Sequence, residues 1–138
     1  ARMALVCWRS FAENPWMAVP MTAVARLLPP RPQPAANAPG MFAFADPEHV
    51  SDVLTAAGWK APQFEPLDID LDIAAGRGLM EAVAQSTEIG AVNSWLRNQP
   101  EAVVAAAIAA LRTALEPFAD GMSVRLPGAM WLIGSTPA

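Results

Sequence analysis

Two short, unbroken apolar runs constrain the fold of this chain more than any other feature of its sequence. Met3–Trp8 reads MALVCW and Met130–Ile133 reads MWLI, with no polar residue inside either run. Runs of this kind predict strands that are covered on both faces, as in the interior of parallel sheets. We expect Met130–Ile133 to be a central strand. Because Met3–Trp8 stands so near the first residue, we also expect an upstream portion of the same fold outside this sequence.

A different pattern predicts a third strand. Between Phe64 and Ile73, apolar residues alternate with acidic ones, which indicates a half-exposed strand at a sheet edge. The acidic face carries Asp68, Asp70 and Asp72. A calcium loop would need glycine at the sixth position and glutamate at the twelfth, where this sequence has Ile73 and Leu79. We therefore interpret the three carboxylates as a solvated strand face.

Apolar residues at helical spacing predict helices between these strands. One helix begins at Asn14–Pro15, with Asn14 as its cap, and Pro20 should bend or interrupt it. A second helix spans Pro47–Ala57, with Asp46 at the N-cap and proline in the first turn. Its expected buried stripe is Val50, Val53, Leu54 and Ala57.

Two further helices are predicted in the second half of the chain. One spans Leu79–Arg97 with Gly90 as a weak point, and the other begins at Pro100. Their expected core residues are Val83, Ile89, Val92, Leu96, Val104, Ile108, Leu111 and Leu115. Residues 29–40 are proline-rich and predict an extended loop, too short to separate two domains. We therefore expect residues 1–138 to form a single domain.

Composition and charge exclude several classes of partner. The chain is 54% hydrophobic and 16% charged, with a formal net charge of -4 and no cluster of basic residues. This balance argues against nucleic acid, because phosphate binding needs concentrated positive charge. We expect no membrane span, since no apolar stretch approaches the roughly 18 residues that one requires. The single cysteine permits no internal disulfide and fits a cytoplasmic protein.

No residue of the sequence identifies a catalytic centre or a metal site. His49 is the only histidine, and its place in the first turn of a helix indicates an exposed residue rather than a general base. Cys7 lies in an apolar run, where burial should raise the pKa of its thiol and make it a poor nucleophile. Glycine-rich nucleotide-binding motifs and the G-x-S-x-G elbow are absent from the sequence.

The order of these elements resembles the C-terminal half of a class I S-adenosylmethionine-dependent methyltransferase, over essentially the whole chain. MALVCWRSFAENPW resembles the fifth strand of that fold and the substrate-side segment that follows it. PGMFAFADPEHVSDVLTAAGW is similar to the helix that leads to the sixth strand, FEPLDIDLDI to the sixth strand, and VRLPGAMWLIGSTP to the seventh. Residues 77–118 resemble a helical insertion between the last two strands.

The resemblance implies an α/β fold, the C-terminal part of a Rossmann-like sheet, with about three strands in the order 5-7-6 and about four helices. It implies transfer of a methyl group from S-adenosylmethionine to a small organic molecule, with the cofactor-binding residues in the upstream half. Arg9, Asn14, Trp16 and Phe42 are then the candidate substrate-binding residues. No catalytic, cofactor-binding or metal-binding residue is expected in this chain, which should be inactive alone.

The alternative interpretation is a non-catalytic binding or dimerisation module, because the sequence contains no recognisable catalytic group. Under either interpretation the Met3–Trp8 strand would expose one edge if no upstream strand covered it. Neither proline nor lysine protects that edge from pairing. We therefore expect a homodimer formed through the Met3–Trp8 edge and the uncovered face of the sheet.

Overall fold

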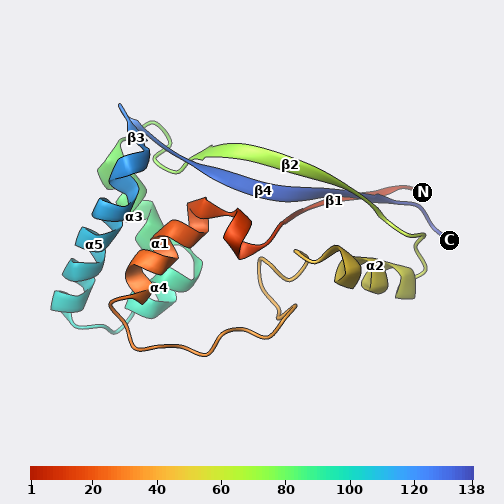
Figure 1. Cartoon of the computed structure of the whole chain (residues 1–138), viewed down its shortest axis with the longest axis horizontal. Coiled ribbons are helices and arrows are strands. Elements are labelled where there is room, and N and C mark those ends of the chain that lie inside the picture. Colours follow the sequence, from red (N-terminus) through yellow and green to blue (C-terminus); the bar gives the residue numbers. More distant parts are fainter. The chain divides into compact units, whose positions relative to one another are not determined.

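The computed structural model describes all residues from 1 to 138 and is of the mixed α/β class (Figure 1). The α-helices are α1 (Pro15–Ala25), α2 (Pro47–Ala56), α3 (Leu79–Glu88), α4 (Gly90–Leu96) and α5 (Glu101–Leu115). The strands are β1 (Met3–Trp8), β2 (Gln63–Asp72), β3 (Ala119–Asp120) and β4 (Ser123–Ser135). Two short 3₁₀ helices are η1 (Phe11–Glu13) and η2 (Glu116–Phe118). None of these helices combines the length and the apolar character needed to cross a bilayer.

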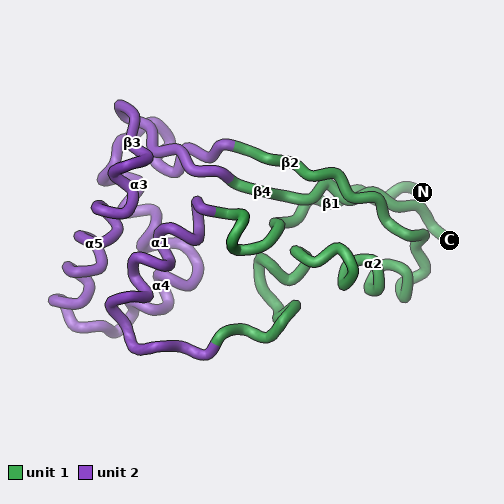
Figure 2. The backbone as a smooth tube through the Cα atoms, in the orientation of Figure 1, with its two compact units in different colours: residues 1–14, 33–69, 128–138 green, residues 15–32, 70–127 purple.

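The chain divides into two compact units, shown in different colours in Figure 2. Unit 1 contains residues 1–14, 33–69 and 128–138, and unit 2 contains residues 15–32 and 70–127. The long strands β2 and β4 each contribute residues to both units. The loop at residues 29–40 contains no helix or strand, as its proline content predicts, and the boundary between the units lies within it.

The sheet has the strand order β1-β4-β2, with β3 paired to β4. Its strands are antiparallel, and Met3 to Trp8 of β1 lie opposite Ser135 to Met130 of β4. The expected central position of Met130–Ile133 and the edge position of β2 are therefore confirmed. The expected burial of β1 on both faces is wrong, because β1 is the other edge of the sheet and Val6 is 54% exposed. An unbroken apolar run cannot distinguish an edge strand from a central one.

In unit 1, α2 and the sheet share a small core. Val50, Leu54 and Ile133 are buried there, with Leu5, Cys7, Phe44, Trp59 and Trp131 among the side chains packed around them. The predicted start of α2 is confirmed, because the Asp46 carboxylate accepts a hydrogen bond from the Glu48 amide at 2.9 Å. Two members of the expected stripe, Val53 and Ala57, are exposed instead. The buried face of α2 is thus narrower than the spacing of its apolar residues suggests.

In unit 2, the helices α1, α3, α4 and α5 surround the larger core. Its buried residues are Val24, Ala74, Ala82, Val83, Val92, Leu96, Ala107, Leu111, Leu115, Val124 and Leu126. The expected core position of Ile108 is wrong, since Ile108 is exposed and the neighbouring Ala107 is buried. Alanines fill much of α5, so hydrophobic spacing alone could not assign which of its faces packs inward.

Two predicted helices differ from the structure in detail. The expected helix Leu79–Arg97 is two helices, because Gly90 has a φ of 53° at the junction between α3 and α4. Ile89 lies at this junction and is exposed rather than in the core. By contrast, α1 continues through Pro20, which is buried in unit 2. Packing of α1 compensates for the hydrogen bond that proline cannot donate.

Candidate substrate site at the end of β1

The segment that leaves β1 contains two of the predicted site residues and is folded by its own polar side chains. A short 3₁₀ helix, η1, follows Arg9 and Ser10. The Ser10 hydroxyl and amide both donate to Glu13 Oε2, at 2.6 and 3.1 Å. These bonds close the turn, so that Arg9 and Glu13 project from one compact bend in unit 1.

Arg9 links this bend to strand β2. Its Nη1 donates to Asp68 Oδ1 at 2.7 Å, and its Nη2 and Nε donate to Glu13 Oε1 at 2.7 and 3.1 Å. The guanidinium also lies over the ring of Trp131, 5.2 Å from its centroid. The Arg9 side chain is 16% exposed and that of Asp68 is 79% exposed. Arg9 is therefore held from three sides, while the carboxylate of Asp68 remains accessible.

The electrostatics of this cluster follow from its hydrogen bonds. The bond from the Ser10 hydroxyl, followed by that from Arg9, lowers the pKa of Glu13 below its ordinary value. The bond to Glu13 is the largest cause that raises the pKa of Arg9. Two carboxylates and one guanidinium meet here, so the formal charges of the cluster sum to -1. The cluster favours a ligand with hydrogen-bond donors over an anion.

Asn14 is fully buried and connects the end of this segment to β4. Its Nδ2 donates to the carbonyl oxygens of Ser10, Ala129 and Arg9, at 2.9, 3.1 and 3.3 Å. Its Oδ1 accepts a hydrogen bond from the Ala129 amide at 2.8 Å. The predicted role of Asn14 in substrate binding stays a prediction, and the structure gives the side chain a positioning role within unit 1.

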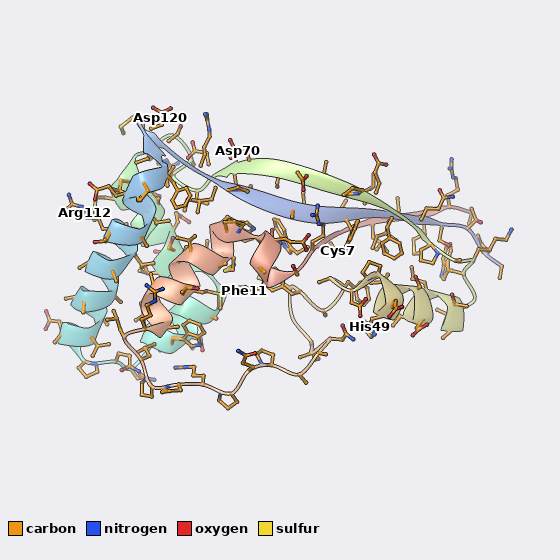
Figure 3. All side chains as sticks on the ribbon, viewed as in Figure 1. Cys7, Phe11, His49, Asp70, Arg112 and Asp120 are labelled. Atoms are coloured by element: carbon orange, nitrogen blue, oxygen red, sulfur yellow. The ribbon has the colours of Figure 1, made fainter.

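Aromatic side chains lie beside the bend. Phe42 packs edge-on against Phe11 with ring centroids 5.8 Å apart, and Phe11 is exposed. Figure 3 shows Phe11 in the turn after β1 and Cys7 on the strand. The Cys7 thiol donates to the Phe44 carbonyl at 3.4 Å, and burial raises its pKa, in the direction that the sequence predicts. His49 on α2 packs against Phe44, with centroids 6.1 Å apart, and is half-buried rather than exposed.

Trp16 belongs to unit 2 and lines a separate small cavity. The other residues around this cavity are Met17, Pro20, Ile73, Gln85, Ser86, Ile89 and Val92. Its volume is about 20 Å³, which is room for a single water molecule. The structure thus joins Arg9 and Asn14 by a hydrogen bond in unit 1, where Phe42 contacts Phe11, whereas Trp16 belongs to unit 2.

Two of the acidic residues of β2 have specific partners. Asp68 pairs with Arg9, and Asp72 accepts hydrogen bonds from the amides of Val124, Ala74 and Gly76. These amides, that of Val124 first, lower the pKa of Asp72. Asp68 and Asp70 are exposed, as the interpretation of a solvated strand face predicts, whereas Asp72 is half-buried and bonded to backbone amides. The contacts with Arg9 and Val124 join residues 59 and 52 positions apart, so no local pattern indicated them, whereas Ala74 and Gly76 lie within four residues of Asp72.

The site has four members that sequence reasoning missed: Phe11, Glu13, Asp68 and Trp131. The four-residue separation between Arg9 and Glu13 is a usable signal for an ion pair, but Asp68 and Trp131 reach Arg9 only through the sheet. The chain contains no group of three or more histidine, cysteine, aspartate or glutamate side chains suited to a metal ion. The site offers a polar and aromatic wall.

Comparisons with known proteins assign no family to this chain. No protein-family model matches it, and no curated protein matches its sequence.

Proposed function

We propose that this chain is the C-terminal part of a class I S-adenosylmethionine-dependent methyltransferase that acts on a small organic molecule. The observation that carries the proposal is the strand order β1-β4-β2, with β4 antiparallel between the other two. The resemblance implies this order for the fifth, seventh and sixth strands of such a sheet. The capped helix α2 also precedes β2, as the resemblance implies.

Within that protein, the end of β1 would supply part of the substrate wall. Ligands of open α/β sheets gather at the carboxyl ends of the strands, and the Arg9 bend follows the carboxyl end of β1. Arg9 would orient Glu13 and Asp68, because three of its donors are already bonded to them. The exposed carboxylate of Asp68 would accept a hydrogen bond from a hydroxyl or amino group. Phe11 and Phe42 would contact an apolar part of the substrate.

The residues of this chain do not fit the cofactor itself. When bound, S-adenosylmethionine supplies an activated methyl group, so the protein needs mainly to align the acceptor. Its charged and ribose groups call for a glycine-rich turn and an acidic partner, and the sequence contains no such turn. A helix N-terminus can bind an anionic group, but at the N-terminus of α2 the Asp46 carboxylate already accepts a hydrogen bond from the Glu48 amide. We therefore assign no step of methyl transfer to these residues.

The proposal is tested with the longer protein that the upstream reading frame encodes. Calorimetry should show binding of S-adenosylmethionine to this protein. The Asp68→Asn variant should keep cofactor affinity while weakening the transfer of labelled methyl groups to acceptors. Glu88→Gln is a matched control at an exposed site of α3. A folded longer protein without affinity for the cofactor would overturn the proposal.

A non-catalytic binding or dimerisation module is the second candidate, and the open edge of β1 favours it. The upstream reading frame distinguishes the two candidates. A strand followed by a glycine-rich turn would support the methyltransferase. A stop codon or an unrelated domain directly upstream would support the module.

A further inference from the structure

The segment that follows α1 contains a proline motif that the proposed function does not use. Residues 26–32 read RLLPPRP, so that Pro29 and Pro32 stand three positions apart. All seven residues belong to unit 2 (Figure 2), and none of them lies in a helix or a strand. The polyproline II helix has three residues per turn. Pro29 and Pro32 would therefore share one side of such a helix.

The sequence itself restricts the backbone of this segment to the polyproline II region. Proline fixes its own φ near about −65°. A residue that precedes proline is restricted to extended or polyproline II conformations. Every residue from Leu28 to Pro32 either is a proline or directly precedes one. The segment therefore has little conformational freedom to lose when a partner binds it.

The prolines of the segment are accessible. Pro29, Pro30, Arg31 and Pro32 are all exposed, and no hydrogen bond between backbone groups involves them. Three of these four residues have no N–H group. The segment therefore cannot pair with a strand along its length, and it offers a partner mainly carbonyl acceptors and the faces of its proline rings.

Two contacts with unit 2 flank the first two prolines. Leu28 packs against the core of unit 2, and its amide donates to the Ala25 carbonyl at 3.3 Å. The guanidinium of Arg31 lies over the ring of Trp95 on α4, 5.3 Å from its centroid. Unit 2 thus holds the segment on both sides of Pro29 and Pro30, while these prolines stay exposed.

The segment is basic in a chain whose formal net charge is -4. Arg26 and Arg31 are both exposed. The ion pairs of the structure involve Arg9 and Arg77, so neither Arg26 nor Arg31 is paired with a carboxylate. Both guanidinium groups can therefore meet acidic side chains of a partner.

We propose that residues 26–32 dock into a polyproline-binding domain of another protein, of the SH3 kind. Such domains bind P-x-x-P segments in grooves that are lined by aromatic side chains. Pro29 and Pro32 fill two pockets of the groove from one side of the segment. Arg26 and Arg31 select a groove whose rim carries carboxylates, because like charges would repel them.

This inference does not depend on the proposed methyltransferase, because residues 26–32 do not include the Arg9 bend. Its test measures binding and not methyl transfer, so the two proposals can fail separately. If the prolines serve only as a rigid connection between α1 and α2, no polyproline-binding domain will recognise the folded chain.

The probe is a panel of purified, isotopically labelled SH3 domains with acidic groove rims. Addition of the chain should shift the amide resonances of the groove residues in at least one domain. Replacing both Pro29→Ala and Pro32→Ala should raise the dissociation constant by about tenfold or more. Pro34→Ala is the matched control, because Pro34 is an exposed proline of the same loop outside the P-x-x-P spacing. It should leave the affinity unchanged.

Two outcomes would overturn the proposal: no domain of the panel binds the wild-type chain, or the variant without Pro29 and Pro32 binds as tightly as the wild type. Circular dichroism checks that each variant is folded, which we expect because the substituted residues are exposed.

The charge of the groove is tested separately. Replacing both Arg26→Ala and Arg31→Ala should weaken binding by about tenfold and remove most of its dependence on ionic strength. Arg112→Ala, at an exposed position of α5, is the control and should change neither quantity. Unchanged affinity and salt dependence in the variant without Arg26 and Arg31 would overturn the assignment of an acidic rim.

Discussion

At the scale of single residues, Asn14 shows how one side chain can fix the path of the chain. It is fully buried, and its amide bonds to backbone groups of both the β1 exit and β4. Asn14→Ala should lower the free energy of unfolding by about 2–4 kcal/mol, because more than one buried backbone group loses its partner. Asn14→Asp should cost at least as much, since a carboxylate would face three carbonyl oxygens.

Chemical denaturation of these variants measures the effect, with Ser94→Ala at an exposed position as the control. A loss for Asn14→Ala no larger than that of Ser94→Ala would show that Asn14 does not hold the two segments together.

Glu13 makes the stability depend on pH. Its pKa is lowered in the folded state, so folding favours the ionised carboxylate. This contribution is complete above the ordinary glutamate pKa of about 4.3, and it is lost as the pH falls through the lower folded-state pKa. Glu13→Gln should therefore flatten the decline in stability below about pH 4.3. Denaturation midpoints measured from about pH 3 to about pH 7 give this dependence of stability on pH.

In the same titration, Glu88→Gln on the exposed surface of α3 should leave the slope unchanged. A slope that is identical in the wild type and Glu13→Gln would contradict the assigned role of the Ser10 and Arg9 bonds.

At the scale of elements, the structure has two helices, α3 and α4, where the sequence predicts a single helix. Gly90 has a φ of 53°, and a Cβ atom added there would meet nothing within 4 Å. Gly90→Ala should therefore destabilise the protein through backbone strain alone, by about 1–2 kcal/mol. In a continuous helix the same change would stabilise it by about 1 kcal/mol.

Thermal denaturation gives the sign of the effect. Gly134→Ala is a useful comparison, because Gly134 has no left-handed φ and its nearest atom to an added Cβ is 4.0 Å away. An increase in melting temperature for Gly90→Ala would indicate that α3 and α4 are one helix.

At the scale of the whole molecule, the proposed function separates binding of the substrate from binding of the cofactor. Residues 1–138 contain the Arg9 bend and its aromatic neighbours but no glycine-rich turn. Under the proposal, the chain alone should neither bind S-adenosylmethionine measurably nor transfer its methyl group. Incubation of the purified chain with labelled cofactor checks this expectation. A measurable rate of transfer would place a complete site within these residues.

Local patterns were sufficient to predict most of the elements. Asp46 and Pro47 predict the start of α2, because capping and the missing proline amide act within one turn. The apolar run at Met3–Trp8 and the alternation before Asp72 predict β1 and β2 for the same reason. The short strand β3 and the break at Ile89 were missed. A two-residue strand has no period, and a single glycine is compatible with a helix.

Of the candidate site, the sequence by itself determined that Arg9 and Asn14 follow the end of a strand and that four residues separate Arg9 from Glu13. Only the tertiary structure decided that Asp68 and Trp131 meet Arg9 and that Asn14 is bonded to Ala129. It also decided that β1 is an edge strand with Val6 exposed. The physical reason is range: caps, turns and periodicity act over a few residues, whereas strand order and ion pairs between strands join segments whose separation leaves no local trace.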